Sequence, residues 1–140
     1  MEKTEDLMAH DPIAPVVRKM DDVQSSPVGR SRDASIQVLI GPQEGAPNFN
    51  LRCFTLEPGG MIPAHRHSDI EHEQVVLEGE MVLGLGDQEV TVTAGDCVLI
   101  PSGTVHWYEN RGRVPVRFLC IVPRTRDYQT EWIARPGETS

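Results

Sequence analysis

The chain has 140 residues and a formal net charge of −8 at pH 7. This length suits one ordinary domain with its own core, so we expect a single active centre. An acidic chain lacks the basic face that nucleic acids and anionic membranes require, so we expect neither as a partner. No apolar run approaches the roughly 20 residues that cross a bilayer, and residues 1–12 do not resemble a secretory signal.

The cysteines indicate a reducing compartment. Cys53, Cys97 and Cys120 are odd in number, far apart and set in apolar stretches. This pattern fits buried thiols in the core better than a disulfide framework. We therefore expect a cytoplasmic protein.

Residues 1–33 form a polar N-terminal leader or arm with several Pro and Gly residues and no sustained periodicity. Part of it, Val16 to Val23, is a candidate edge strand. Arms of this kind sometimes cross to a second protomer. Residues 124–140 form a polar tail in which Trp132 and Ile133 are expected to cover an open end of the domain.

Residues 34–123 have a different texture, with short apolar runs separated by Gly, Pro, Asp or Asn. No helical stripe of ten residues or more occurs in this range. The pattern predicts an all-β domain closed as a barrel or double sheet, since open edges need covering. The expected strands occupy residues 35–41, 50–58, 73–86, 88–95, 97–103, 105–112 and 116–123.

Four of the five histidines lie at the expected starts of strands, next to turns. His65 and His67 point to one face of an extended chain, roughly 6 to 7 Å apart. His72 follows after a polar connection long enough to reverse the chain, and His106 follows a Pro-Gly turn. Neutral imidazole is the commonest metal ligand among side chains. An isolated His-x-His pair also occurs on half-exposed strands with polar outward residues, so this pair alone leaves both readings open.

The spacing of the whole set resembles the two motifs of the cupin family. The first motif, G(x)5HxH(x)3,4E(x)6G, is matched by Gly59, His65, His67 and Gly79, with His72 at the place of Glu. The second, G(x)5PxG(x)2H(x)3N, is matched by Gly95, Pro101, Gly103, His106 and Asn110. The resemblance covers residues 34–123 and implies a double-stranded β-helix, or jelly-roll barrel.

The histidine at position 72 resembles a subgroup of small single-domain cupins that bind their metal with four imidazoles. The resemblance therefore implies that His65, His67, His72 and His106 bind one divalent transition metal. Nitrogen ligands suit Fe, Mn, Ni, Zn, Cu or Co better than Ca or Mg, and the sequence leaves the identity open. Four neutral ligands leave the charge of the ion uncancelled, which favours an anionic small molecule as the ligand.

Three further residues are candidates for binding the substrate. Gln74 shares the inward face of His72, and Tyr108 shares that of His106, so we expect both on the wall of the site. Tyr108 is a candidate acid and Gln74 a candidate for orienting a substrate oxygen. Arg52 would meet a carboxylate if it points inward. For each residue the alternative is ordinary lining, or for Arg52 an outward position.

Two functions remain open at this stage. The first is a metal-dependent enzyme acting on a small oxygenated acid or sugar acid, by isomerase or lyase chemistry or as a dioxygenase. The second is a non-catalytic, metal-dependent cupin that binds or senses a small molecule. We expect a homodimer in either case, because small cupins commonly pair.

Overall fold

The computed structural model describes residues 13–125 and 129–133. Its regular elements are strands and two 3-10 turns, η1 (Met20–Asp22) and η2 (Pro42–Glu44). The strands are β1 (Ser25–Pro27), β2 (Arg32–Ile40), β3 (Phe49–Arg66), β4 (His72–Glu78), β5 (Glu80–Leu85), β6 (Gln88–Thr93), β7 (Cys97–Ile100), β8 (His106–Glu109), β9 (Val116–Pro123) and β10 (Glu131–Trp132). The expectation of an all-β fold is confirmed. In the described ranges no helix is long and apolar enough to cross a membrane.

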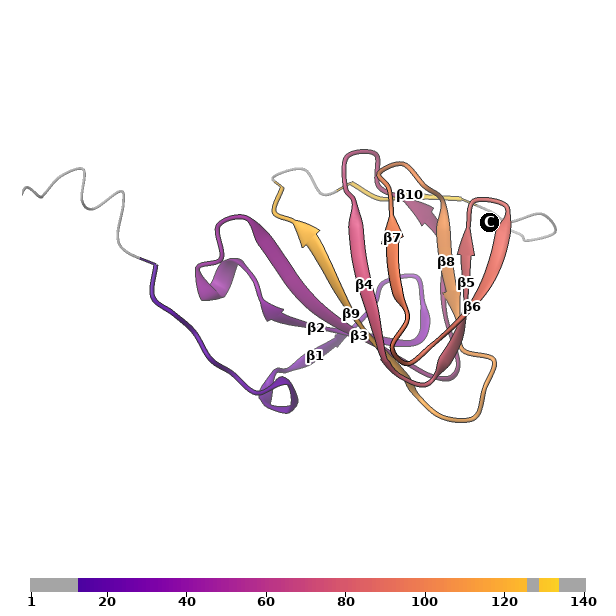
Figure 1. Ribbon diagram of the computed structural model, residues 1–140, viewed down its shortest axis with the longest axis horizontal. Helices are drawn as coiled ribbons and strands as arrows, with labels where there is room; N and C mark the ends of the chain where they lie inside the picture. The colour runs from indigo at the N-terminus through magenta and orange to yellow at the C-terminus, as the bar shows by residue number, and fades with distance from the viewer. Residues whose placement is uncertain (1–12, 126–128, 134–140) are drawn as a thin grey trace, which may run out of the picture.

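One curled sheet wraps around a central space (Figure 1). Its main path runs β6-β5-β8-β3-β9-β4-β7, with β1 paired to β2, and both β2 and β10 paired to β3. The first half of β3 lies between β2 and β9, whereas its last residues lie between β8 and β10. This is the jelly-roll architecture that the motifs predicted.

Strand β3 differs from the expected strand over 50–58, because it continues to Arg66. The change of partners occurs around Gly59 and Gly60, just beyond the end of the expected strand. Gly59 has a φ of 84°, and a Cβ at Gly60 would lie 2.6 Å from the carbonyl oxygen of Asp33. The two glycines therefore let one strand bend from one side of the barrel to the other.

The expected strand over 73–86 is divided at Gly79, which separates β4 from β5. Gly79 has a φ of 84°, and a Cβ there would come within 2.5 Å of the carbonyl oxygen of Pro115. The apolar pattern continues through this turn because both strands face the same core, so the sequence did not reveal the break.

The main core fills the space between the two sides of the barrel. Its most buried members are Leu56, Leu83, Val116 and Phe118, each fully buried. Phe118 stacks on Phe54 and on Tyr108, with ring centroids 5.2 Å and 5.0 Å apart. This aromatic stack marks the boundary between the apolar core and the histidine end of the barrel.

The prediction of an edge strand over Val16–Val23 is wrong. Residues 13–19 have no regular structure, η1 follows, and the edge strand is β1 instead. Val23 and Met20 cover Leu39 and Cys53 on the outer face of β2 and β3, and Gln37 donates to the carbonyl groups of Met20 and Val23. This segment is therefore tied down by its backbone carbonyls, which carry no sequence signal. Residues 1–12 lie outside the described ranges, and the division of the chain at 33/34 and 123/124 stays a prediction.

The prediction that the tail covers an open end is confirmed for its described part. Trp132 lies opposite His65 in the pairing of β10 with β3, and the amide of Ile133 donates to the carbonyl oxygen of Ala64 at 2.8 Å. The expectation of three buried thiols holds for Cys53 and Cys120, but Cys97 is exposed. Cys97 begins β7 on its outward face. The residues that follow it in the sequence are apolar, but no described part of the fold packs over its side chain.

Candidate metal centre and its cavity

Three strands bring the histidines together. His65 lies near the end of β3 and His67 just beyond it, while His72 and His106 are the first residues of β4 and β8. Strand pairing places His65 opposite His106. The spacing of the motifs therefore corresponds to strand ends that meet at one end of the barrel.

All four imidazoles are buried and adjacent. The ring centroids of His65 and His106 lie 4.2 Å apart, and those of His65 and His67 5.1 Å apart. The centroid of His72 lies 5.1 Å from that of His67 and 5.0 Å from that of His106. The sequence-based expectation of one histidine cluster is therefore met by the ring positions.

Three of these side chains offer nitrogen atoms close enough for one ion. The potential ligand atoms of His65, His67 and His106 all lie within 4.8 Å of one another, a group that does not include His72. These three buried histidines could hold a metal ion. That His72 completes a four-histidine site stays a prediction.

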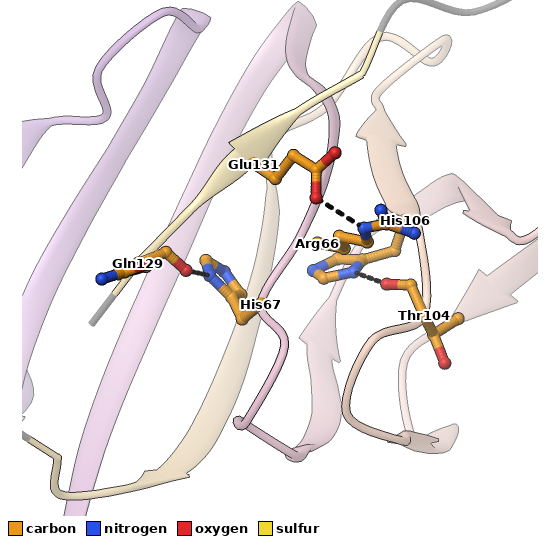
Figure 2. A network of polar contacts seen from close by, with 6 residues as sticks. All are labelled: Arg66, His67, Thr104, His106, Gln129 and Glu131. Atoms are coloured by element: carbon orange, nitrogen blue, oxygen red, sulfur yellow. Dashed lines mark hydrogen bonds and ion pairs between the residues drawn. The ribbon is translucent and has the colours of Figure 1, made fainter. Parts of the chain in front are cut away.

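Backbone carbonyls orient three of the rings, and Figure 2 shows two of these contacts, those of His67 and His106. The Nδ1 atoms of His65, His67 and His106 lie 2.7 to 2.9 Å from the carbonyl oxygens of Pro63, Gln129 and Thr104, respectively. A ring that donates its Nδ1–H in this way keeps the lone pair on Nε2 for a metal. The Nε2 atom of His106 and the Nδ1 atom of His72 are buried without a hydrogen-bond partner, which leaves both atoms available to bind an ion.

Burial keeps the imidazoles neutral. Desolvation lowers the pKa of His65 to about 4, that of His106 to about 3 and that of His72 to about 2, and it also lowers the pKa of His67. The neighbouring histidines and the charge of Arg52 lower these pKa values further. At neutral pH every ring is therefore unprotonated, which is the form that binds metal.

A cavity of about 190 Å³ opens beside the cluster and is bordered by all four histidines. Tyr108, which we expected on the wall, also lines it, and so does Arg52, whose face the sequence left open. Gln74 is buried as its strand parity predicted, and its Nε2 donates to the Tyr108 hydroxyl at 2.7 Å. Gln74 therefore lies behind the wall and contacts the cavity through Tyr108, while its own Oε1 is buried without a partner.

Arg52 points into the barrel. One of its terminal nitrogens lies 3.1 Å from the sulfur of Cys120, and its guanidinium lies 5.1 Å from the ring centroid of Phe54. Because β3 residues 52, 54 and 56 share a face, Arg52 continues the inward row that ends in the core. Parity alone allowed either face, and the tertiary structure selected the inward one.

Sequence reasoning missed three contributors to the site. Cys120 lines the cavity, and its sulfur accepts hydrogen bonds from Arg52 and Gln74, although we expected only a core residue there. Its alternation with Phe118 and Val122 on β9 was the available signal. The carbonyl of Gln129 holds His67, and Glu131 pairs with Arg66 at 2.8 Å to fasten β10 over the site (Figure 2). A backbone carbonyl leaves no trace in a sequence.

The histidine cluster, the barrel and the motif turns agree with a family match: residues 52–122 match the Cupin domain family. The chain belongs to the cupin family. The matched segment begins at Arg52 and ends at Val122, so it contains all four histidines.

Among solved structures, the polyketide cyclase RemF from Streptomyces resistomycificus is similar, at 30% identity and a TM-score of 0.80 over 86% of each chain. A sugar phosphate isomerase, SPO2919 from Silicibacter pomeroyi, shares 26% identity at a TM-score of 0.72, over 82% of this chain and 80% of that one. The Bacillus subtilis protein YdbB is 41% identical over 72 residues, which are 51% of this chain and 58% of YdbB. The chain spans between 15% and 58% of the length of the curated relatives that it matches.

Proposed function

We propose that this cupin is a metal-dependent enzyme that acts on a small anionic oxygenated molecule. His65, His67, His72 and His106 would hold one divalent transition metal. The observation that carries the proposal is the burial of four neutral imidazoles against one cavity, with nitrogen atoms left unpaired. Unpaired polar atoms destabilise a core by about 1–3 kcal/mol each, so their presence here favours a site that binds a ligand.

The charge around the cavity favours an anion. Four neutral imidazoles leave the charge of a divalent ion uncancelled, and the guanidinium of Arg52 adds a second positive group. Among the described residues that line the cavity there is no carboxylate. In this proposal Arg52, which lines the cavity, binds a substrate carboxylate, for which its planar donors are well suited.

Tyr108 is the residue that we propose to move a proton at a substrate oxygen. Tyr108 lines the cavity, and the Nε2 of Gln74 donates to its hydroxyl at 2.7 Å. Because the amide donates to the oxygen, the phenol can direct its own proton to a developing alkoxide or enolate. Gln74 acts in this scheme as a positioning residue.

When bound, a divalent metal supplies Lewis acidity for a carbonyl or enolate oxygen. Isomerase or lyase chemistry is the branch that we propose, since it needs only this acidity and a proton donor. The similar proteins point to small-molecule chemistry of this broad kind, as a cyclase and an isomerase by name. Oxygen uptake by an iron-loaded protein would assign the dioxygenase branch instead.

Elemental analysis tests the metal site. Wild-type protein purified anaerobically is expected to contain about one metal ion per chain, and His106→Ala and His72→Ala should each lose most of it. Glu73→Ala is the matched control, because Glu73 neighbours His72 but its side chain is exposed. Equal metal content in the wild type and both histidine variants would overturn the proposal.

A further inference from the structure

Outside the histidines, the wall of the cavity is mostly apolar. Six side chains that line it are hydrophobic or aromatic: Val28, Ile36, Phe54, Ile62, Tyr108 and Trp132. They come from the loop after β1 and from β2, β3, β8 and β10, so they surround the space rather than form one stripe. An occupant of this cavity must therefore present apolar surface in several directions.

Three of these side chains are aromatic rings around the same space. Phe54 and Tyr108 both stack on the buried ring of Phe118, which fixes their orientation. Trp132 lies on another wall, with its ring centroid 5.1 Å from that of His65. The guanidinium of Arg30 lies 5.0 Å from the Trp132 ring centroid. Rings held in this way present apolar surface in fixed orientations to a ligand.

The polar groups on the wall are few. Besides the imidazoles, the described residues that line the cavity supply the Arg52 guanidinium, the Tyr108 hydroxyl, the Thr130 hydroxyl and the Cys120 thiol. A sugar carries a hydroxyl group on nearly every carbon, and each group buried without a partner costs affinity. These side chains suffice for one carboxylate and one or two further oxygens, but not for a polyol.

The volume limits the size of the apolar part. A cavity of about 150 Å³ lined by Leu, Ile and Phe accommodates benzene. The present cavity, at about 190 Å³, has room for one such ring and a short side chain. A fused polycyclic body would have to extend beyond it.

We propose that the substrate of this cupin is a carboxylate or enolate with a single aromatic ring, or an apolar group of similar bulk, as its body. The oxygen atoms face the histidines and Arg52, and the ring lies among Phe54, Tyr108 and Trp132. This inference rests on the proposed function for the placement of the oxygen atoms. The placement of the ring depends only on the wall.

Matched acids test the inference by isothermal titration calorimetry on the full chain as purified. Phenylpyruvate and pyruvate carry the same 2-oxo acid and differ by the ring, as do 3-phenylpropanoate and propanoate without the keto group. Gluconate serves as the sugar acid. We expect each ring-bearing acid to bind about 10- to 100-fold more tightly than its partner, the gain from burying a Phe-sized group. Equal or weaker binding of the ring-bearing acids, or tighter binding of gluconate than of phenylpyruvate, would overturn the inference.

Two wall variants locate the ring. Trp132→Ala and Ile36→Ala are each expected to reduce the preference for phenylpyruvate over pyruvate by about threefold or more, since apolar contact area is lost. Leu99→Ala, an exposed apolar residue on β7, is the control and should leave the ratio unchanged. A ratio that survives both wall substitutions would place the ring elsewhere and contradict the inference.

Metal content measured on the same samples separates this inference from the proposed function. If a sample without metal still binds 3-phenylpropanoate more tightly than propanoate, the proposed metal site is contradicted and the inference about the ring stands. If a sample with a full complement of metal binds pyruvate and phenylpyruvate equally, the inference about the ring is contradicted and the proposed metal site stands.

Discussion

The two ends of the barrel use the same strands for opposite purposes. On β9, Val116 and Phe118 at one end are fully buried among apolar neighbours, whereas Cys120 towards the other end contacts Arg52 and Gln74. The buried amide of Asn110, near the apolar end, donates to the carbonyl oxygens of Leu56 and Val114 and accepts from the amide of Gly112. At the histidine end, nitrogen atoms of His72 and His106 and the Oε1 of Gln74 are buried without partners.

The two ends therefore differ in what their buried polar groups do: those at the apolar end stabilise the fold, and those at the histidine end are available to bind a ligand. A satisfied polar group such as Asn110 fastens the chain, because it joins the loop after β8 to the bend of β3. Unsatisfied groups destabilise the protein alone and become favourable only when a ligand supplies the missing partner. Substitutions at the two ends should therefore have opposite signatures in stability and in metal binding.

Among the substitutions, Phe118→Ala is expected to have the largest effect on stability. The ring is fully buried and stacks on two others, so its removal should lower the free energy of unfolding by about 3–5 kcal/mol. Urea denaturation measures this loss. Metal content per folded chain should remain near the wild-type value. A loss of metal from the folded variant at low urea would contradict the separation of the two ends.

Asn110→Ala should cost about 2–3 kcal/mol, because it leaves the carbonyls of Leu56 and Val114 without their donor in a buried site. The same denaturation experiment applies. Asn110→Asp is the matched control that keeps the size of the side chain and the acceptor for Gly112 but loses the donor. If both variants are as stable as the wild type, the amide does not fasten the bend of β3.

Acid should destabilise the metal-free protein below pH 6.5. The folded-state pKa values of His65, His72 and His106 are lowered to about 4, 2 and 3, so between those values and 6.5 the unfolded state binds more protons. Stability is then full above the unfolded pKa and decreases as the pH falls, by up to about 1.4 kcal/mol per pH unit for each histidine. Thermal unfolding in EDTA from pH 7 to pH 4.5 measures the slope. A flat profile would mean that the rings are not neutral in the fold.

The smallest effect has the opposite sign. In the metal-free protein His72→Leu should raise the free energy of unfolding by about 1 kcal/mol, since it removes a buried nitrogen that has no partner. His65→Leu is the comparison, because it also removes the bond to the Pro63 carbonyl and should destabilise the protein. A loss of stability in His72→Leu equal to that in His65→Leu would show that His72 supports the fold.

The sequence by itself determined the fold class, the cupin motifs and the residues that meet at the histidine end. The fold class follows from local periodicity, because alternate residues on a strand share a face and Gly and Pro turns separate the strands. The grouping of the four histidines followed from the resemblance of their spacing to the cupin motifs. The sequence also determined that Gln74 is buried on the face of His72, because parity along a single strand needs no knowledge of its neighbours.

Only the tertiary structure decided the composition of the wall. The inward position of Arg52, the exposure of Cys97, the bend of β3 at Gly59–Gly60 and the anchoring of His67 by the Gln129 carbonyl all depend on which segments become neighbours. Such neighbours are far apart in the chain, and backbone groups are identical at every position. The sequence therefore predicted which histidines gather in one place, whereas the shape and chemistry of the cavity came from the packing of β2, β3, β8, β9 and β10 around it.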